Sequence, residues 1–443
     1  MALCWILSEP LHCVVDEVDN YVTRQMRRQH AVGLSLAVVK DSRLVLAKGF
    51  GSANVELDFP VNRETGFDIA SIGKQFTAAA AMILVEQAKM RLDDRITNYL
   101  SDLPQAWSQV TIRHLLTHTS GIKNYTDLPN FKDLAKSHIS TQKLVKLMAD
   151  YPLDFAPGER WAYSNTGYHL LADIIENVSG KPYETFLKER IFAPLQMNST
   201  WIDDGMMIIT NRASGYSWQE GVLHNADYFD MSWTRGAGGE VSTVLDMAKW
   251  DAALDSERLL SKKRLEQMWT PVRLNDGGSY PYGFGWQVFQ MDSDHRLLAH
   301  SGFDFGFNSC IYRWIDDRTT VIVLLTAGTP LMGNGSDSAD YIAWGLSRHF
   351  IPRLKDKAIK DTSPEMTGRA KGFLESIIQG TFDSKLLAEG IRTQWPPKGK
   401  RLASELEGLG EMRSFQLVRK EDDGPIRTYS TALDSRRTPC SSA

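Results

Sequence analysis

The sequence predicts an α+β protein: an antiparallel β-sheet flanked by terminal helices, an inserted all-helical lobe, and a small C-terminal α+β module. Three observations predict this fold. A β-hairpin pattern near residue 40 gives way to a long, mostly helical stretch over about residues 75–255. Strand-like runs return only after residue 285, as an antiparallel meander. A polar segment then separates the last part of the chain from the rest.

The first elements are a helix and a hairpin. Apolar residues recur at helical spacing over residues 14–26 and predict an amphipathic helix. Residues 32–39 and 44–47 are typical of two strands, joined by a turn at residues 41–42. Ser35 lies in a Gly-x-Ser-x-Ala pattern that superficially resembles a nucleophile elbow. That motif needs a sharp strand-to-helix turn, and here a second strand follows, so we do not expect Ser35 to be a nucleophile.

A buried helix is predicted from about Ile72 to Met90. Good helix formers dominate this segment, and apolar side chains lie nearly all round its first half. This pattern indicates a core helix rather than a surface helix. Lys74, Gln75 and Glu86 interrupt the apolar run, so the segment is too short and too polar to span a membrane.

The late part of the chain predicts more strands and a closing helix, and we expect both strand groups to join in one sheet. The predicted strands are residues 287–290, 296–300, 308–314 and 320–325, and the predicted helix is residues 337–350.

The organisation that follows is one main domain and a small module. Residues 1–352 form the main domain, with the helical lobe over about 75–255 inserted in the sheet, and residues 353–365 form a linker. Residues 366–443 form an α+β segment that rests on the main domain or is incomplete, because two strands alone are marginally stable. Its predicted parts are helices at 366–379 and 401–407, strands at 414–418 and 426–430, and an unstructured tail from 435.

Composition excludes several classes of protein. The net charge of −4 and the lack of a Lys/Arg-rich tract argue against nucleic-acid binding. Four scattered cysteines form no Cys-x-x-Cys motif, so neither a disulfide framework nor a zinc site is predicted. The N-terminus has a short apolar run with no basic residue before it, which makes no convincing signal peptide. The sequence leaves compartment and oligomeric state open, and it indicates no cofactor or metal.

The first candidate site is Ser71 with Lys74. Residues three apart on a helix face the same way, so a hydroxyl and an amine lie together at the start of a buried helix. Burial is expected to lower the pKa of the amine, which is one way to activate a weak nucleophile. Ser-x-x-Lys also occurs at Ser120 and Ser140, but the first lies in a turn and the second is typical of a helix N-cap. At Ser71 itself a plain N-cap is the competing interpretation.

Two further motifs supply what such a nucleophile needs. Tyr163-Ser164-Asn165 is the only Tyr-x-Asn in the chain. A phenol beside an ammonium is expected to have a lowered pKa and to relay protons, and an Asn can hold a substrate carbonyl. His300-Ser301-Gly302, the only His-x-Gly, is predicted at a strand end, where Gly permits close approach of the backbone to a carbonyl oxygen. Taken singly, each motif is weak: the first could be a tyrosine in a loop before a helix, and the second could be a turn at a strand end.

His114 and His118 stand four residues apart and could share a metal ion. No Glu lies between them in the metalloprotease pattern, and no acidic third ligand stands out. Packing or hydrogen bonding is therefore the favoured interpretation of this pair.

Together, the three motifs in this order and setting resemble the serine β-lactamase and penicillin-binding protein superfamily. The likeness is to its class C-like branch, which includes DD-carboxypeptidases, D-aminopeptidases and family VIII carboxylesterases. Residues 115–121 and 238–243 resemble further phrases of that family, and the likeness covers roughly residues 12–350. The C-terminal segment loosely resembles an accessory segment of some bacterial members, and the family suggests a bacterial periplasmic or secreted protein.

The resemblance implies roles for the matching residues. Ser71 would be the acylated nucleophile, and Lys74 and Tyr163 would share the base role, the order of proton transfer being left open. Asn165 would orient the substrate. The backbone N–H groups of Ser71 and Phe303 would form the oxyanion hole, within the segment that holds His300, Ser301 and Gly302.

Two residues depart from the family pattern. His300 stands where β-lactamases carry a Lys that binds the substrate carboxylate, and His is mostly neutral at pH 7. This departure weakens a β-lactamase interpretation and suits a peptidase or an esterase. Glu240, after Gly238-Gly239, is more polar than expected, and the sequence offers no account of it.

The leading hypothesis is a serine hydrolase that cleaves small carboxylic esters or amides through an acyl-enzyme, most like a family VIII carboxylesterase. The alternatives are a D-Ala-D-Ala carboxypeptidase, a D-aminopeptidase acting on D-amino-acid peptides, or a weak β-lactamase. A different class is a non-catalytic relative that binds a ligand in the same pocket. Aromatic residues between the second and third motifs could wall an acyl pocket or pack in the core; they are Tyr216, Trp218, Tyr228, Phe229 and Trp233.

Overall fold

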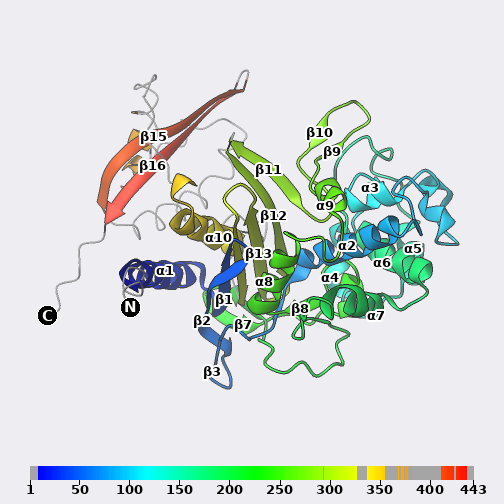
Figure 1. Cartoon of the computed structure of the whole chain (residues 1–443), viewed down its shortest axis with the longest axis horizontal. Helices are drawn as coiled ribbons and strands as arrows, with labels where there is room; N and C mark the ends of the chain where they lie inside the picture. The colour runs from blue at the N-terminus through cyan, green and yellow to red at the C-terminus, as the bar shows by residue number, and fades with distance from the viewer. Residues whose placement is uncertain are drawn as a thin grey trace, which may run out of the picture. The chain divides into compact units, whose positions relative to one another are not determined.

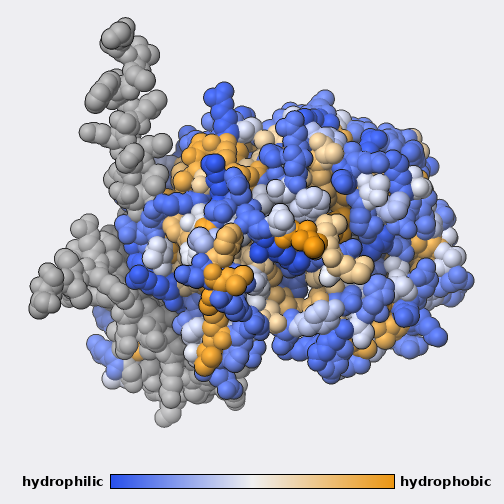
Figure 2. Space-filling model, turned by 90° about the horizontal axis from the view of Figure 1, so that it is seen from below, coloured by the Kyte–Doolittle hydropathy of each residue, from blue (hydrophilic) through white to orange (hydrophobic). Residues whose placement is uncertain are grey.

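The computed structural model divides the chain into two compact units, residues 1–351 and 352–443. It describes residues 8–292, 294–326 and 337–354, some residues between 368 and 381, and the backbone of 411–423 and 426–436. The element order of the chain is followed in Figure 1. The face shown in Figure 2 is mostly hydrophilic, with hydrophobic residues gathered in a few patches. None of the helices among the described residues combines the length and the apolar character needed to cross a bilayer.

The first unit is built on one seven-stranded sheet with the strand order β11-β12-β13-β14-β1-β2-β3. All its neighbouring strands pair antiparallel. The predicted union of the early hairpin and the late meander in one sheet is therefore confirmed. The strands are β1 (Gly33–Lys40), β2 (Arg43–Asn54), β3 (Phe59–Pro60), β11 (Gln287–Asp292), β12 (His295–Asp304), β13 (Phe307–Trp314) and β14 (Thr319–Thr326).

Both faces of this sheet are buried, which the alternation along β1 shows. Leu34, Leu36 and Val38 belong to a core with helices α1 (Ser8–Gln29) and α10 (Asp337–Phe350). Ala37 and Val39 belong to a second core with the helical lobe. The sheet thus separates the two terminal helices from the lobe, as Figure 1 shows.

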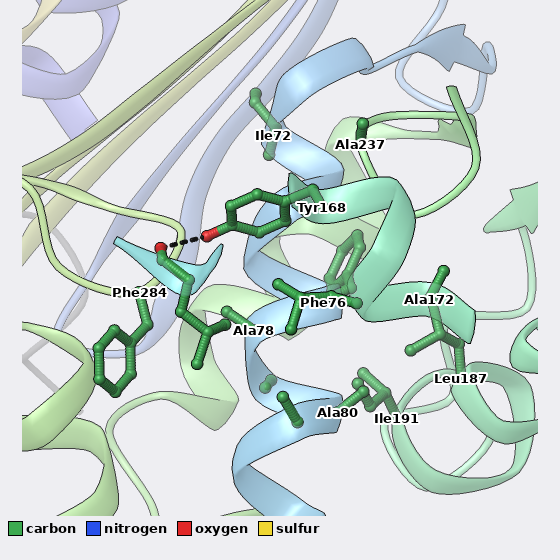
Figure 3. Close-up of a cluster of buried hydrophobic side chains, with 14 of the residues drawn as sticks. Ile72, Phe76, Ala78, Ala80, Tyr168, Ala172, Leu187, Ile191, Ala237 and Phe284 are labelled. Atoms are coloured by element: carbon green, nitrogen blue, oxygen red, sulfur yellow. Dashed lines mark hydrogen bonds between the residues drawn. The ribbon is translucent and has the colours of Figure 1, made fainter. Parts of the chain in front are cut away.

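The helical lobe packs around helix α2 (Lys74–Glu86), in which every residue from Lys74 to Val85 is buried. Figure 3 shows Phe76, Ala78 and Ala80 of this helix beside side chains of α6 and α7, where the Tyr168 hydroxyl donates to the Leu116 carbonyl at 2.8 Å. The other helices are α3 (Ile112–Leu116), α4 (Phe131–Leu134), α5 (Thr141–Met148), α6 (Asn165–Ser179), α7 (Tyr183–Leu187), α8 (Val244–Ala253) and α9 (Lys262–Met268).

Two details of the lobe differ from the prediction. The helix predicted from Ile72 to Met90 begins as a 3₁₀ turn, η1 (Ala70–Gly73), and ends at Glu86. The chain between β3 and β11 also contains short strands that were not predicted, because two to four residues show no measurable periodicity. They are β4 (Phe67–Asp68), β5 (Trp201–Ile202), β6 (Tyr216–Gln219), β7 (Val222–Asn225), β8 (Glu240–Ser242), β9 (Val272–Arg273) and β10 (Ser279–Tyr280).

A buried ion-pair cluster joins the sheet to the lobe. The Arg313 guanidinium, on β13, pairs with Asp251 on α8 and with Asp255 just beyond it. Asp251 is buried and also accepts a hydrogen bond from Thr320 Oγ1 at 2.7 Å. Burial raises the pKa of Asp251, and Arg313 and Thr320 oppose that rise. These contacts fix α8 against the sheet.

The second unit contains a hairpin of β15 (Glu411–Asp423) and β16 (Ile426–Arg436). Both strands are longer than predicted. The linker over 355–365, the helix predicted at 401–407 and the tail after 436 lie outside the described residues. The helix predicted at 366–379 is described in part, and residues 371–373 and 375–377 are helical.

Candidate active site

Ser71 lies in the 3₁₀ turn that leads into α2. Its neighbour Ala70 has a φ of 46°, in the left-handed region that residues with a side chain rarely adopt. Such backbone strain concentrates at functional sites, and here it turns the chain just before the serine. No side chain caps η1 or α2, so the competing interpretation of Ser71 as a plain N-cap does not apply.

Lys74 is fully buried behind Ser71 and makes three hydrogen bonds. Its Nζ lies 2.9 Å from Ser71 Oγ and 2.8 Å from Asn165 Oδ1, and it also contacts the Ala237 carbonyl. Burial lowers the pKa of Lys74 to about 7, against a smaller opposite effect of Glu240 and Asp304. The predicted fall in this pKa is confirmed. A neutral amine in this place can donate to the two oxygens and accept the proton of Ser71.

Tyr163 completes the contact set, since its hydroxyl donates to Ser71 Oγ at 2.8 Å. The Lys74 Nζ lies 4.9 Å from the centre of the Tyr163 ring, and the centres of the Tyr163 and His118 rings are 4.3 Å apart. Burial raises the pKa of Tyr163, although its hydrogen bond with Ser71 acts in the opposite direction. The expected fall in the tyrosine pKa is therefore wrong, because desolvation outweighs the hydrogen bond with Ser71.

Asn165 is held in place by the start of helix α6. Ser164 caps this helix by accepting the Gly167 N–H, and the Asn165 N–H donates to Asn124 Oδ1 at 3.0 Å. Because Asn165 Oδ1 accepts from Lys74, its Nδ2 group is left for a bound carbonyl oxygen.

His300 lies within β12 rather than at its end, and it is neutral. Its Nδ1 is 2.7 Å from the Ser301 carbonyl, which can only accept, so Nδ1 carries the proton. Nε2 then accepts the hydroxyl of Tyr282 at 2.9 Å. Burial, together with Lys74, lowers the pKa of His300 to about 3. The expectation that this position lacks a fixed positive charge agrees with these contacts.

Gly302 allows β12 to touch the segment before Ser71. A Cβ at this position would lie 2.3 Å from the Ile69 carbonyl oxygen, closer than any side chain can come. Ser309, opposite Gly302, donates to that same oxygen at 2.6 Å. Strands β12 and β13 are therefore fixed to the turn that carries Ser71.

A pocket of about 730 Å³ opens over these groups. Seven of the eight predicted site residues line it, while Lys74 lies buried beneath; the seven are Ser71, Tyr163, Asn165, His300, Ser301, Gly302 and Phe303. The structure thus brings all eight together at one place. Their catalytic and binding roles stay predictions.

The aromatic wall of the pocket differs from the predicted set. Of the five aromatic residues expected there, Phe229 lines the pocket, with its ring stacked on Phe305 at 4.9 Å. Tyr216 and Trp233 are buried, Trp218 stacks on His30, and Tyr228 is exposed. Other parts of the chain supply the remaining wall, with Tyr125, Phe131, Trp161, Tyr282 and Phe305.

The rejected candidates have local partners. Ser140 caps helix α5, and Lys123, in the Ser120 motif, pairs with Asp154 at 3.5 Å. His114 caps the start of α3, and His118 Nδ1 accepts the Ser164 N–H at 3.1 Å. The two histidines therefore serve hydrogen bonding and packing, as the favoured interpretation held.

Two acidic residues of the site were not found by sequence reasoning. Asp304 lines the pocket and is 8% exposed. Glu240, noted but unexplained, is 1% exposed and interacts electrostatically with Lys74. Both residues stand out because their carboxyl groups are buried, and their burial could be known only from the fold.

A serine hydroxyl whose proton can pass to a desolvated amine, on this sheet-and-lobe fold, defines a serine hydrolase. The chain belongs to the Beta-lactamase family, whose model matches residues 18–343. Penicillin-binding protein 4* of Bacillus subtilis (strain 168) is 30% identical over 408 residues, which cover 87% of this chain and 86% of that protein.

Two other relatives act on D-amino-acid substrates according to their names. The D-aminopeptidase of Brucella suis is 28% identical over 69% of this chain, which spans 58% of that protein's length. The D-amino acid amidase from Ochrobactrum anthropi SV3, solved with L-phenylalanine amide, is 28% identical with a TM-score of 0.65. That comparison covers 78% of this chain and 99% of the amidase.

Proposed function

We propose that this serine hydrolase cleaves small amides, with D-amino-acid amides or short D-amino-acid peptides as substrates, through an acyl-enzyme on Ser71. The observation that carries the proposal is the mutual contact of Ser71 Oγ with Lys74 Nζ at 2.9 Å and with the Tyr163 hydroxyl at 2.8 Å. The names of the aminopeptidase and amidase relatives support the substrate class.

The contacts support one order of proton transfers. Ser71 Oγ attacks the amide carbon while its proton passes to neutral Lys74, and the carbonyl oxygen takes the negative charge. Backbone N–H groups of Ser71 and Phe303 stabilise that charge, and Asn165 orients the substrate. The C–N bond then breaks as the leaving nitrogen receives a proton from Tyr163, which is replaced from Lys74. Water then attacks the ester on Ser71 while giving a proton to neutral Lys74, and the bond to Ser71 Oγ breaks as Lys74 returns a proton to it, which releases the acid.

The raised pKa of Tyr163 supports Lys74 as the first base. A phenol that holds its proton tightly does not take one from Ser71, but it can pass a proton on in a relay. Lys74, with a pKa of about 7, is neutral in a useful fraction at neutral pH.

Pocket charge argues against substrates that present a carboxylate. His300 is neutral, and the described residues that line the pocket include no Lys or Arg. A β-lactam or the free end of a D-Ala-D-Ala peptide would find no fixed cation at the pocket surface. We therefore favour cleavage of amides without a free carboxylate over penicillin hydrolysis and carboxypeptidase activity.

Ester cleavage, the leading hypothesis from sequence, would use the same acyl-enzyme. The relatives described above do not specify it. We retain short acyl esters as test substrates because esters acylate a serine more readily than amides do.

The test is to label the protein with a fluorophosphonate, identify the modified peptide by mass spectrometry, and assay four compounds. These are D- and L-phenylalaninamide, p-nitrophenyl butyrate and nitrocefin. We expect label on Ser71 and faster turnover of D- than of L-phenylalaninamide. Label elsewhere, or no label and no turnover, would contradict the proposal and favour a ligand-binding relative.

A further inference from the structure

Asp304 is a buried carboxyl group at the pocket wall with an incomplete set of partners. It ends strand β12, lines the same pocket as Ser71 and is 8% exposed. Its Oδ1 accepts the Phe305 N–H at 2.7 Å. Its Oδ2 has no hydrogen-bond partner among the described residues. A carboxylate so deeply buried is costly to keep unless a cation or several donors meet it.

The nearby cations are already engaged. Arg212 pairs with Asp203 at 2.6 Å and with Asp68 at 3.2 Å, so a single guanidinium serves two carboxylates beside Asp304. Lys74 is hydrogen-bonded to Ser71, Asn165 and Ala237. No ion pair of Asp304 with a described side chain is present. Burial, reinforced by Asp68, raises the pKa of Asp304 to about 7.

This arrangement leaves an excess of negative charge on one side of the pocket. Asp304 is the acidic residue among the described residues that line it, and Lys and Arg are absent from the same set. A ligand with a positive charge would therefore gain a charge-assisted hydrogen bond, while a ligand with a carboxylate would be repelled.

We propose that Asp304 binds the ammonium group of the substrate, so that the enzyme selects amides whose acyl group carries a free amine. The inference rests on the proposed function, because it assumes that acyl transfer to Ser71 occurs in this pocket. Asp304 follows Phe303, the residue proposed to hold the carbonyl oxygen. An amine close to the scissile carbonyl, as in an amino-acid amide, is within the reach of both residues.

The aromatic wall agrees with this class of substrate. Phe131, Phe229 and Phe305 all line the pocket. The ring centres of Phe229 and Phe305 are 4.9 Å apart, and those of Phe131 and Phe229 are 6.1 Å apart. An apolar or aromatic side chain on the amino acid can pack there while its ammonium group faces Asp304.

The competing explanation is that Asp304 only stabilises the turn after β12 through the Phe305 N–H. The experiment must therefore separate binding of an amine from folding of the turn. Two substrates do so: D-phenylalaninamide, and 3-phenylpropanamide, which has the same ring and amide but no amine. At pH 7 much of the amine is protonated, since α-amino groups titrate near 8.

The measured quantity is the ratio of kcat/KM for the amine substrate to kcat/KM for the neutral one. We expect a ratio well above one in the unaltered enzyme, and a fall of about ten- to hundredfold in Asp304→Asn, expressed mainly in KM. Asp227→Asn is the matched control, because Asp227 is exposed at a neighbouring hollow and its charge is screened by water. That variant should leave the ratio within about twofold.

The outcomes are distinguishable. A ratio near one in the unaltered enzyme, or an equal loss on both substrates in Asp304→Asn, would overturn the role of Asp304. Equal loss with a lowered Tm would assign the residue to the turn alone. If the unaltered enzyme cleaves neither amide nor p-nitrophenyl butyrate and Ser71 takes no label, the proposed function itself fails.

Discussion

The carboxyl group of Glu240 lies against the α-carbon of Gly73, and a Cβ added to Gly73 would come within 1.7 Å of Glu240 Oε2. Neither carboxyl oxygen has a hydrogen-bond partner within the described part of the chain. Gly73 directly precedes Lys74, so a buried carboxyl stands beside the backbone that carries the proposed base. Burial raises the pKa of Glu240 to about 7, and Lys74 acts in the opposite direction.

Gly73→Ala is expected to destabilise the protein by about 1–3 kcal/mol, because the new methyl group must displace a buried carboxyl. The measurement is urea unfolding followed by tryptophan fluorescence. Gly73→Ala combined with Glu240→Ala should recover part of this loss, since the two groups compete for one space. Strict additivity of the two single effects would show that the contact does not limit stability.

Glu240→Gln is expected to move the acid limb of the kcat/KM profile to lower pH. A carboxylate near Lys74 favours the ammonium form, so its removal lowers the lysine pKa and keeps the amine neutral at lower pH. The measurement is kcat/KM for D-phenylalaninamide between pH 5 and 9. Glu64→Gln, an exposed site, serves as the control and should leave the limb in place. A shift to higher pH would contradict the electrostatic argument.

The unaltered enzyme should gain activity as pH rises through about 7, because Lys74 must lose its proton to act as a base and its pKa is about 7. Lys74→Met should lower kcat/KM by about 10²–10⁴-fold and remove this limb. Steady-state rates in buffers of constant ionic strength test both points. A limb that survives in Lys74→Met would assign the titration to another group.

Tyr163→Phe should lower kcat by about 10²–10⁴-fold and leave the rise of kcat/KM with pH at the same pH as in the unaltered enzyme. The ring and its contact with His118 remain, while the hydroxyl that donates to Ser71 is lost. The raised pKa of Tyr163 keeps its proton on throughout this pH range. Loss of the limb in this variant would make tyrosine, rather than lysine, the first base.

Arg313→Met is expected to cost about 3–5 kcal/mol of unfolding free energy, because it leaves the buried Asp251 carboxylate without its partner. Arg318→Met, in the turn between β13 and β14, is the matched control. Its ion pair with Asp41 is exposed on both sides and should contribute no more than about 1 kcal/mol. Equal effects in chemical unfolding would refute the distinction between the two pairs.

Local signals were sufficient to predict much of the fold. The helix predicted at 337–350 coincides with α10, and the turn at residues 41–42 joins β1 to β2 as expected. These elements are long, strongly periodic or bounded by turn residues. Strands β4, β5 and β8 consist of two or three residues each and exist because they pair with one another, which no local pattern records.

The candidate site divides in the same way. Ser71, Lys74 and Tyr163 could be proposed because their spacing and order form motifs. Other features depend on which groups become buried together. They are the raised pKa of Tyr163, the interaction of Glu240 with Lys74, and the position of Asp304 at the pocket. The pocket wall was partly misjudged because Trp233 is buried in the core and segments distant in sequence supply other rings.

Strand β1 lies between β2, its immediate successor, and β14, which is formed by Thr319–Thr326 near the end of the first unit. During synthesis on the ribosome, the β1 edge of the β1–β2 hairpin therefore stays unpaired until β14, near the end of the first unit, has been synthesised. Pairing between strands so distant in sequence slows folding, and an unpaired strand edge can pair with other chains. A shortened chain that keeps Ser71, Lys74 and Tyr163 but stops before Thr319 should accumulate as aggregates rather than as a smaller enzyme.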